Sequence, residues 1–88
     1  MDEVSKLELI SLIIQHSIDG SNIMEMMFKI IPSYELLKKY LDLMQENDLI
    51  TYHKFDKTFF ATSKGLDFLY VYNDLNEMIE NCNKLHYS

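Results

Sequence analysis

The sequence contains no arginine, only two glycines, one proline and one cysteine. So little glycine and proline excludes a disordered, loop-rich or collagen-like chain. A single cysteine, Cys82, excludes an internal disulfide framework, so we expect a chain that works in the cytoplasm. No apolar run approaches the ~18 residues of a membrane span. The acidic start at Asp2 and Glu3, with Glu8 inside the first apolar run, argues against a secretion signal.

What is present is the composition of one small globular domain, with 88 residues of which 48% are hydrophobic and 25% charged. A chain of this length buries only about 60–65% of its unfolded surface, so its stability is thin unless another contact adds to the core. Eight lysines against 14 acids give a formal charge of −6. That is the wrong overall sign for a nucleic-acid binder.

Helical spacing of apolar residues dominates the N-terminal half. The first pattern covers residues 4–18, in which Leu7, Ile10, Ile14 and either Leu12 or Ile13 recur at helical intervals. Gly20 supplies a stop, and Ser21 is a candidate N-cap for a short second helix over about residues 22–30.

A third helix is expected after Pro32, which cannot continue the second helix. Pro32 or Ser33 opens it, and Asn47, in the left-handed conformation, is expected to end it. Its apolar residues are spaced as one buried stripe: Leu37, Tyr40, Leu41 and Met44.

The pattern then changes to β-branched and aromatic runs at residues 49–54 and 58–63, which predict a two-stranded hairpin. Thr62 or Ser63 caps a last long helix that begins near Lys64. The predicted fold is therefore mainly α with a small β-hairpin, in the order helix, helix, helix, hairpin, helix. Two helices joined by a tight break and followed by a hairpin are typical of a winged helix-turn-helix.

The last helix carries an apolar heptad pattern, with intervals that alternate between three and four residues. Such a helix outruns a core built from about 60 residues, and a second copy of the same helix is the simplest cover. We predict a homodimer in which residues 1–64 form the winged-helix domain and residues 65–88 the dimerisation helix. The alternative is a tail folded back on its own domain. The predicted interface comprises the heptad residues Phe68, Val71, Leu75, Met78, Cys82 and Leu85, with Ile79 widening the apolar face.

Residues for catalysis or metal binding are not grouped in the sequence. The histidines His16, His53 and His86 fall in three different predicted elements without ligand spacing, and there is no glycine-rich phosphate loop. We expect no enzyme, no metal and no cofactor.

DNA contact is favoured by the distribution of the lysines rather than by their number, since five of the eight fall within residues 33–64. A merely solvated surface explains the same lysines, and without arginine the chain lacks the commonest partner for guanine. In a winged helix the third helix enters the major groove and the hairpin touches the backbone. The predicted DNA-contacting residues are Ser33, Tyr34, Lys38, Lys39, Lys54, Lys57 and Lys64.

Four motifs together resemble one family. MMF at 26–28 is similar to its I-M-Y, SYELLKKYL at 33–41 to [SN]-Y-x-x-L-K-x-Y-L, NDLITY at 47–52 to its K-G-L-I, and ATSKGLDFL at 61–69 to T-x-K-G-x-x-F-L. The family is that of the small archaeal winged-helix proteins that dimerise through an antiparallel coiled-coil tail. The resemblance implies a DNA-binding, chromatin-associated or regulator-like protein and an antiparallel dimer.

Four positions depart from that family pattern. Pro32 stands where leucine is usual, Glu25 and Leu36 where residues are often basic or polar, and Asp48 where glycine is usual. Three of these make the predicted DNA face less basic or less polar. A second hypothesis is therefore an acidic protein-interaction module that does not bind DNA, with exposed Leu36 and Leu43 in its partner patch.

Overall fold

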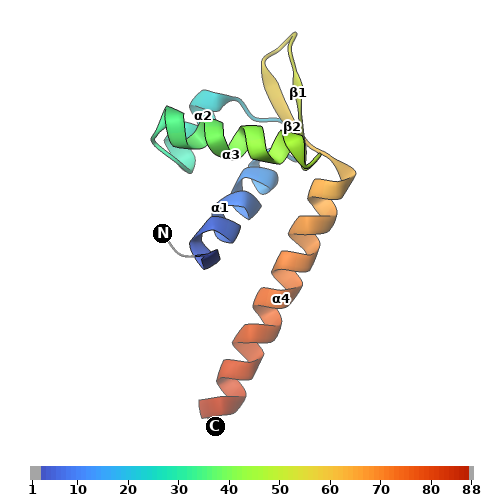
Figure 1. Ribbon diagram of the computed structural model, residues 1–88. Coiled ribbons are helices and arrows are strands. Elements are labelled where there is room, and N and C mark those ends of the chain that lie inside the picture. Colours follow the sequence, from blue (N-terminus) through green and yellow to red (C-terminus); the bar gives the residue numbers. More distant parts are fainter. Residues whose placement is uncertain (1–2, 88) are drawn as a thin grey trace.

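The computed structural model describes the backbone of residues 3–87 and the side chains of residues 6–82. Three short helices and the base of a hairpin form one body, from which the hairpin and the distal part of the last helix project in opposite directions (Figure 1). The molecule is elongated, with extents of 53 × 26 × 20 Å. The observed order confirms the predicted fold class. The elements are α1 (Glu3–His16), α2 (Ile23–Lys29), α3 (Tyr34–Glu46), β1 (Ile50–His53), β2 (Thr58–Ala61) and α4 (Ser63–Tyr87).

Polar side chains fix where three of the helices begin. Asn22 Oδ1 and Ser33 Oγ each accept a hydrogen bond from the backbone N–H three residues later, at 2.9 and 3.3 Å. Thr62 Oγ1 does the same for α4 at 3.0 Å. These are N-caps, which satisfy backbone donors that the first helical turn leaves without partners. Of the two residues expected to open the third helix, Ser33 rather than Pro32 is the cap, and of the two expected for the last helix, Thr62 rather than Ser63. The predicted cap at Ser21 is wrong, since Asn22 fills that place.

Ser21 instead forms an isolated antiparallel β-bridge with Phe59 of β2. Its backbone N–H donates to Phe59 O at 3.0 Å, and Phe59 N–H donates to Ser21 O at 2.8 Å. Gly20, at φ +94°, turns the chain into this bridge. A Cβ on Gly20 would lie 2.9 Å from the Phe60 ring and from Thr58 Cγ2, so only glycine lets the chain approach the strand this closely.

Asn47 ends α3 as expected, but the left-handed conformation falls on the next residue. Asn47 has φ −97°, and it is Asp48, at φ +59°, that adopts the left-handed conformation. The Asn47 amide donates to Leu43 O at 2.8 Å and so covers one of the last helical carbonyls. The helix end is therefore confirmed at Asn47, and the expected left-handed conformation is wrong by one residue. Aspartate tolerates this conformation better than most side chains.

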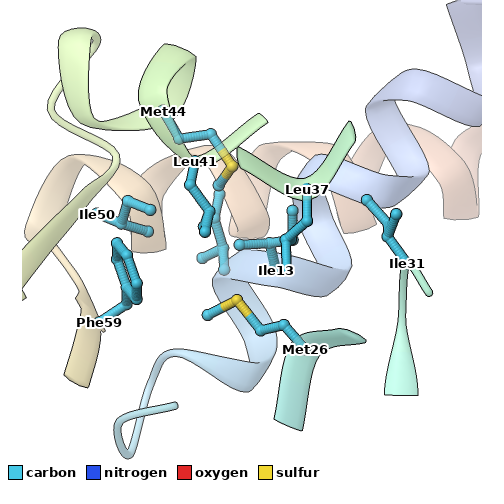
Figure 2. Close-up of a cluster of buried hydrophobic side chains, with 9 residues drawn as sticks. Ile13, Met26, Ile31, Leu37, Leu41, Met44, Ile50 and Phe59 are labelled. Carbon is cyan, nitrogen blue, oxygen red and sulfur yellow. The ribbon is translucent and has the colours of Figure 1, made fainter. Parts of the chain in front are cut away.

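The core lies where α1, α2, α3 and the two strands meet (Figure 2). The predicted stripe on α3 is confirmed for Leu37, Leu41 and Met44, whereas Tyr40 is only half-buried. Leu7 on α1 lies outside the core and is 42% exposed. The buried cluster consists of Ile13, Ile14, Met26, Ile31, Leu37, Leu41, Met44, Ile50 and Phe59.

The first turns of α4 pack against this body, and the rest of the helix extends beyond it (Figure 1). Phe68 and Leu69 are partly buried against the core. Farther along, the side chains of residues 73–82 are all exposed. Over this stretch the tail does not fold back on its own domain, and none of the described residues covers its apolar side chains.

Candidate nucleic-acid interface

The N-terminus of α3 presents two of the predicted DNA-contacting side chains. Ser33 is exposed, and its hydroxyl oxygen caps the helix by accepting from Leu36 N–H. The hydroxyl proton stays available to donate to an acceptor outside the chain. Tyr34 follows it and is 50% exposed. Both side chains therefore lie at the end of the helix with the positive dipole, which favours a phosphate.

The exposed face of α3 is not basic. Lys38 Nζ lies 3.1 and 3.4 Å from the two carboxylate oxygens of Asp42, one helical turn later. Both partners are about half-exposed, at 54%. With Glu35 and Glu46 also exposed, the helix carries three acids against two lysines. A phosphate approaching Lys38 must compete with the carboxylate that already holds it.

A shallow apolar groove runs between α1 and α3 beside Lys39. Leu36 and Leu43, 38% and 48% exposed, contribute two of its walls. Its volume is about 260 Å³. From the sequence, only Leu36 and Leu43 were predicted to form an exposed apolar patch here. The lining residues are Lys6, Ile10, Leu36, Lys39, Tyr40 and Leu43.

The wing, formed by β1, β2 and the loop 54–57, is held stiff by paired rings. Tyr52 and Phe59 face each other across the two strands, with ring centroids 4.7 Å apart. His53 and Phe60 are a diagonal pair, also at 4.7 Å. Cross-strand aromatic contacts of this kind stabilise two-stranded ribbons. The wing thus carries its loop on a defined support.

The wing loop holds two predicted contact residues and an aromatic residue, Phe55, for which the sequence predicted no role. Lys54 and Lys57 are exposed, as predicted. Between them Phe55 is completely exposed, at 105% of its reference area. An aromatic residue inside a predicted turn was the available signal, because turns rarely hold one without a reason. Lys64 is exposed on the first turn of α4, at the base of the wing.

An open groove of about 540 Å³ lies between the wing and the beginning of α2. The sequence did not predict this groove or that Asn22 and Tyr52 line it. The groove exists because the Ser21–Phe59 bridge brings the start of α2 toward the hairpin. The charged residues that line this groove are Lys57 and Asp56. Its lining residues are Asn22, Ile23, Met24, Tyr52, Asp56 and Lys57.

The predicted dimer residues on α4 fall into two groups. Phe68 is partly buried and packs against the core of its own domain. Val71, Leu75, Met78 and Ile79 are each more than half exposed, and Cys82 is exposed. The side chain of Leu85 lies outside the described residues. The free part of the helix therefore presents an apolar stripe.

Features of other kinds of site are not brought together. His16 is half-buried and His53 is exposed on the wing, while the His86 side chain lies outside the described residues. Within the described part of the chain, no three histidine, cysteine, aspartate or glutamate side chains could share a metal ion. None of the helices over residues 3–87 combines the length and apolarity that crossing a membrane would need.

Comparison with known proteins agrees with this architecture. The family model described as winged helix-turn-helix matches residues 5–80, which include all the described elements except the ends of α1 and α4. No curated protein matches the chain.

Proposed function

The chain belongs to the winged helix-turn-helix family, and on this premise we propose that it binds double-stranded DNA as a homodimer. It would act as a transcription regulator or as an architectural, nucleoid-associated factor. The observation that carries the proposal is the wing: a stiffened, projecting hairpin with a loop that is positive in a chain of net charge −6 (Figure 1). Phosphates attract such a local positive site even where the total charge is negative.

The contacts divide between α3 and the wing. Ser33 and Tyr34 at the start of α3, with Lys38 and Lys39 on its exposed face, would touch base edges and phosphates in the major groove. The lysines of the wing and of the first turn of α4 would contact the backbone: Lys54, Lys57 and Lys64. The Lys38–Asp42 pair and the acids of α3 predict weak binding that depends strongly on salt.

The apolar stripe on α4 supports the homodimer. Val71, Leu75, Met78 and Ile79 face water in one chain, although a domain this small needs every apolar contact that it can bury. The heptad spacing of Val71, Leu75 and Met78 fits a second copy of the same helix, with residues 65–88 as the dimerisation segment. Antiparallel pairing, which the family resemblance implies, would place the two wings at opposite ends.

Fluorescence anisotropy with a labelled duplex, titrated at about 50 and 200 mM salt, tests DNA binding directly. Six or more phosphate contacts per dimer should cost on the order of a thousandfold in affinity between these two conditions. Lys39→Glu and Lys54→Glu should weaken binding to all duplex sequences. Lys84→Glu, an equal charge change near the end of α4, should have much less effect. If the two interface variants bind like the wild type, this face is not the DNA contact.

The groove between α1 and α3 supports a second candidate, a protein-interaction module. Its apolar lining with Leu36 and Leu43 suits a peptide side chain better than a phosphate. This function predicts no DNA binding even at about 50 mM salt. It also predicts that Leu36→Lys abolishes association with a protein partner while the fold is retained.

A further inference from the structure

Phe55 is the most exposed large apolar side chain among the described residues, and it lies at the tip of the wing. Burying a phenylalanine ring contributes about 1.5–3 kcal/mol to stability, which makes a wholly solvated one unusual in a domain with a thin core. The hairpin whose loop holds Phe55 projects from the body of the molecule (Figure 1). Within the part of the chain that the structure describes, packing does not account for its position.

The loop that presents Phe55 has a defined conformation. Lys57 adopts a left-handed backbone conformation at φ +52°, a geometry that non-glycine residues enter only where the surrounding structure requires it. Thr58 Oγ1 donates to Asp56 O at 2.9 Å and closes the turn from the other side. Four consecutive strand pairs, from Ile50↔Ala61 to His53↔Thr58, anchor the loop below. The ring is therefore held outward on a rigid support.

The residues around the ring indicate the chemistry of its partner. Lys54, Asp56 and Lys57 are all charged and exposed, so Phe55 is a single ring without apolar neighbours in the loop. A protein interface would bury an apolar patch, which is missing from this loop. A single ring flanked by two lysines instead suits a ligand that has phosphates on its surface, for the lysines, and a narrow apolar space between them, for the ring. The space between two stacked base pairs has this character.

We propose that Phe55 is a wedge that enters between two base pairs of duplex DNA from the minor groove, partly unstacks them and bends the duplex. The inference rests on the proposed DNA-binding function and adds to it a mechanical consequence. Apolar wedges inserted in this way kink DNA by about 20–90°. Lys54 and Lys57 would hold the phosphates on either side. Because pyrimidine–purine steps unstack most easily, the wedge predicts a preference for TA and CA steps.

Two optical readouts on one set of duplexes test the wedge. The duplexes carry a donor and an acceptor dye at their ends, and 2-aminopurine replaces adenine in one TA step at a time. Wild-type protein should shorten the end-to-end distance and raise 2-aminopurine fluorescence at the step it enters. Phe55→Ala should lose both signals, with less than about tenfold loss of affinity, because the cost of unstacking disappears together with the contact.

Three controls make the result specific. Phe28→Ala removes another exposed phenylalanine, 89% exposed on α2, and should behave like the wild type. Phe55→Leu keeps an apolar wedge and should retain part of the bend. The salt dependence of Phe55→Ala should match that of the wild type, because the phosphate contacts remain.

The outcomes separate this inference from the proposed function. If wild-type protein binds duplex DNA without bending or unstacking it, or if Phe55→Ala bends it equally, the wedge is overturned and DNA binding stands. If wild-type protein shows no binding at about 50 mM salt, both the proposed function and the wedge are overturned. Far-UV circular dichroism of Phe55→Ala checks that the variant retains the wild-type fold.

Discussion

Gly65, at the residue scale, lies in the first turn of α4 against the connection between α3 and β1. A Cβ at this position would come within 2.1 Å of Leu49 O, a backbone atom that cannot swing aside. The same carbonyl accepts from Thr62 N–H at 3.1 Å, and the Thr62 hydroxyl donates to Asp48 O. Gly65 therefore lets the start of the tail helix dock closely on the domain.

Replacing this glycine should destabilise the protein, although alanine favours helices elsewhere. Gly65→Ala removes the helix penalty of glycine, about 1 kcal/mol, but must push α4 away from Leu49. We expect a net loss of about 2–3 kcal/mol in the free energy of unfolding, the scale of overpacking in a close-packed site. Urea denaturation followed by circular dichroism measures it.

The control for that substitution lies on the same helix. Asn73→Ala, at an exposed position of α4, should leave the protein as stable or slightly more stable. Equal or higher stability of Gly65→Ala would mean that the docking of α4 is loose, contrary to the geometry described here.

At the scale of elements, the sequence was sufficient for every helix and strand because each has a local signal. The stripe of Leu37, Leu41 and Met44 and the caps at Ser33 and Thr62 depend only on neighbours in the chain. The Ser21–Phe59 bridge could not be predicted, because it joins residues far apart in sequence through backbone atoms that carry no side-chain signature. For the same reason the grooves beside α2 and α1 were missed.

The ion pair on α3 was not predicted from the sequence either. Lys38 was predicted as a DNA contact without regard to Asp42, whose carboxylate lies 3.1 Å from Lys38 Nζ in the structure. An exposed pair of this kind contributes little to stability, about 0.3–0.5 kcal/mol. Its larger effect would be on DNA affinity, because the carboxylate both occupies the lysine and repels phosphates.

Neutralising Asp42 should therefore strengthen DNA binding. Asp42→Asn frees Lys38 and removes one negative charge from the DNA face, and we expect a gain on the order of three- to fivefold in affinity at about 50 mM salt. Anisotropy titration measures the gain. Glu80→Gln, which removes the same charge from the exposed distal part of α4, should change affinity much less. An equal gain from both variants would mean that only total charge matters.

At the scale of the whole molecule, the body has two projections that are open to separate contacts. The hairpin and the distal part of α4 extend from opposite sides of the core (Figure 1), so a contact on one leaves the other free. If two copies pair through α4, the wings face away from the shared helix pair. Such a dimer could touch two separated sites on one duplex or bridge two duplexes.

The free half of α4 gives the most direct test of that arrangement. Leu75→Asp places a carboxylate in the middle of the apolar stripe, where pairing would bury it without a partner, at a cost of several kcal/mol. We expect the wild type to sediment as a dimer and Leu75→Asp as a monomer at the same micromolar concentration. Asn76→Asp, one residue along on the exposed surface, adds the same charge outside the heptad seam and should remain dimeric.

The same two variants connect assembly with DNA. Each Leu75→Asp monomer keeps its own α3 and wing, so binding to a short duplex with one site should weaken little. In a bridging assay, the protein must hold a labelled duplex to a second duplex that is fixed on beads, which needs both wings of a dimer. Leu75→Asp should lose this bridging, and Asn76→Asp should keep it. Bridging by a variant that sediments as a monomer would show that the two contact surfaces lie within one chain, and the helix pair would then have no part in it.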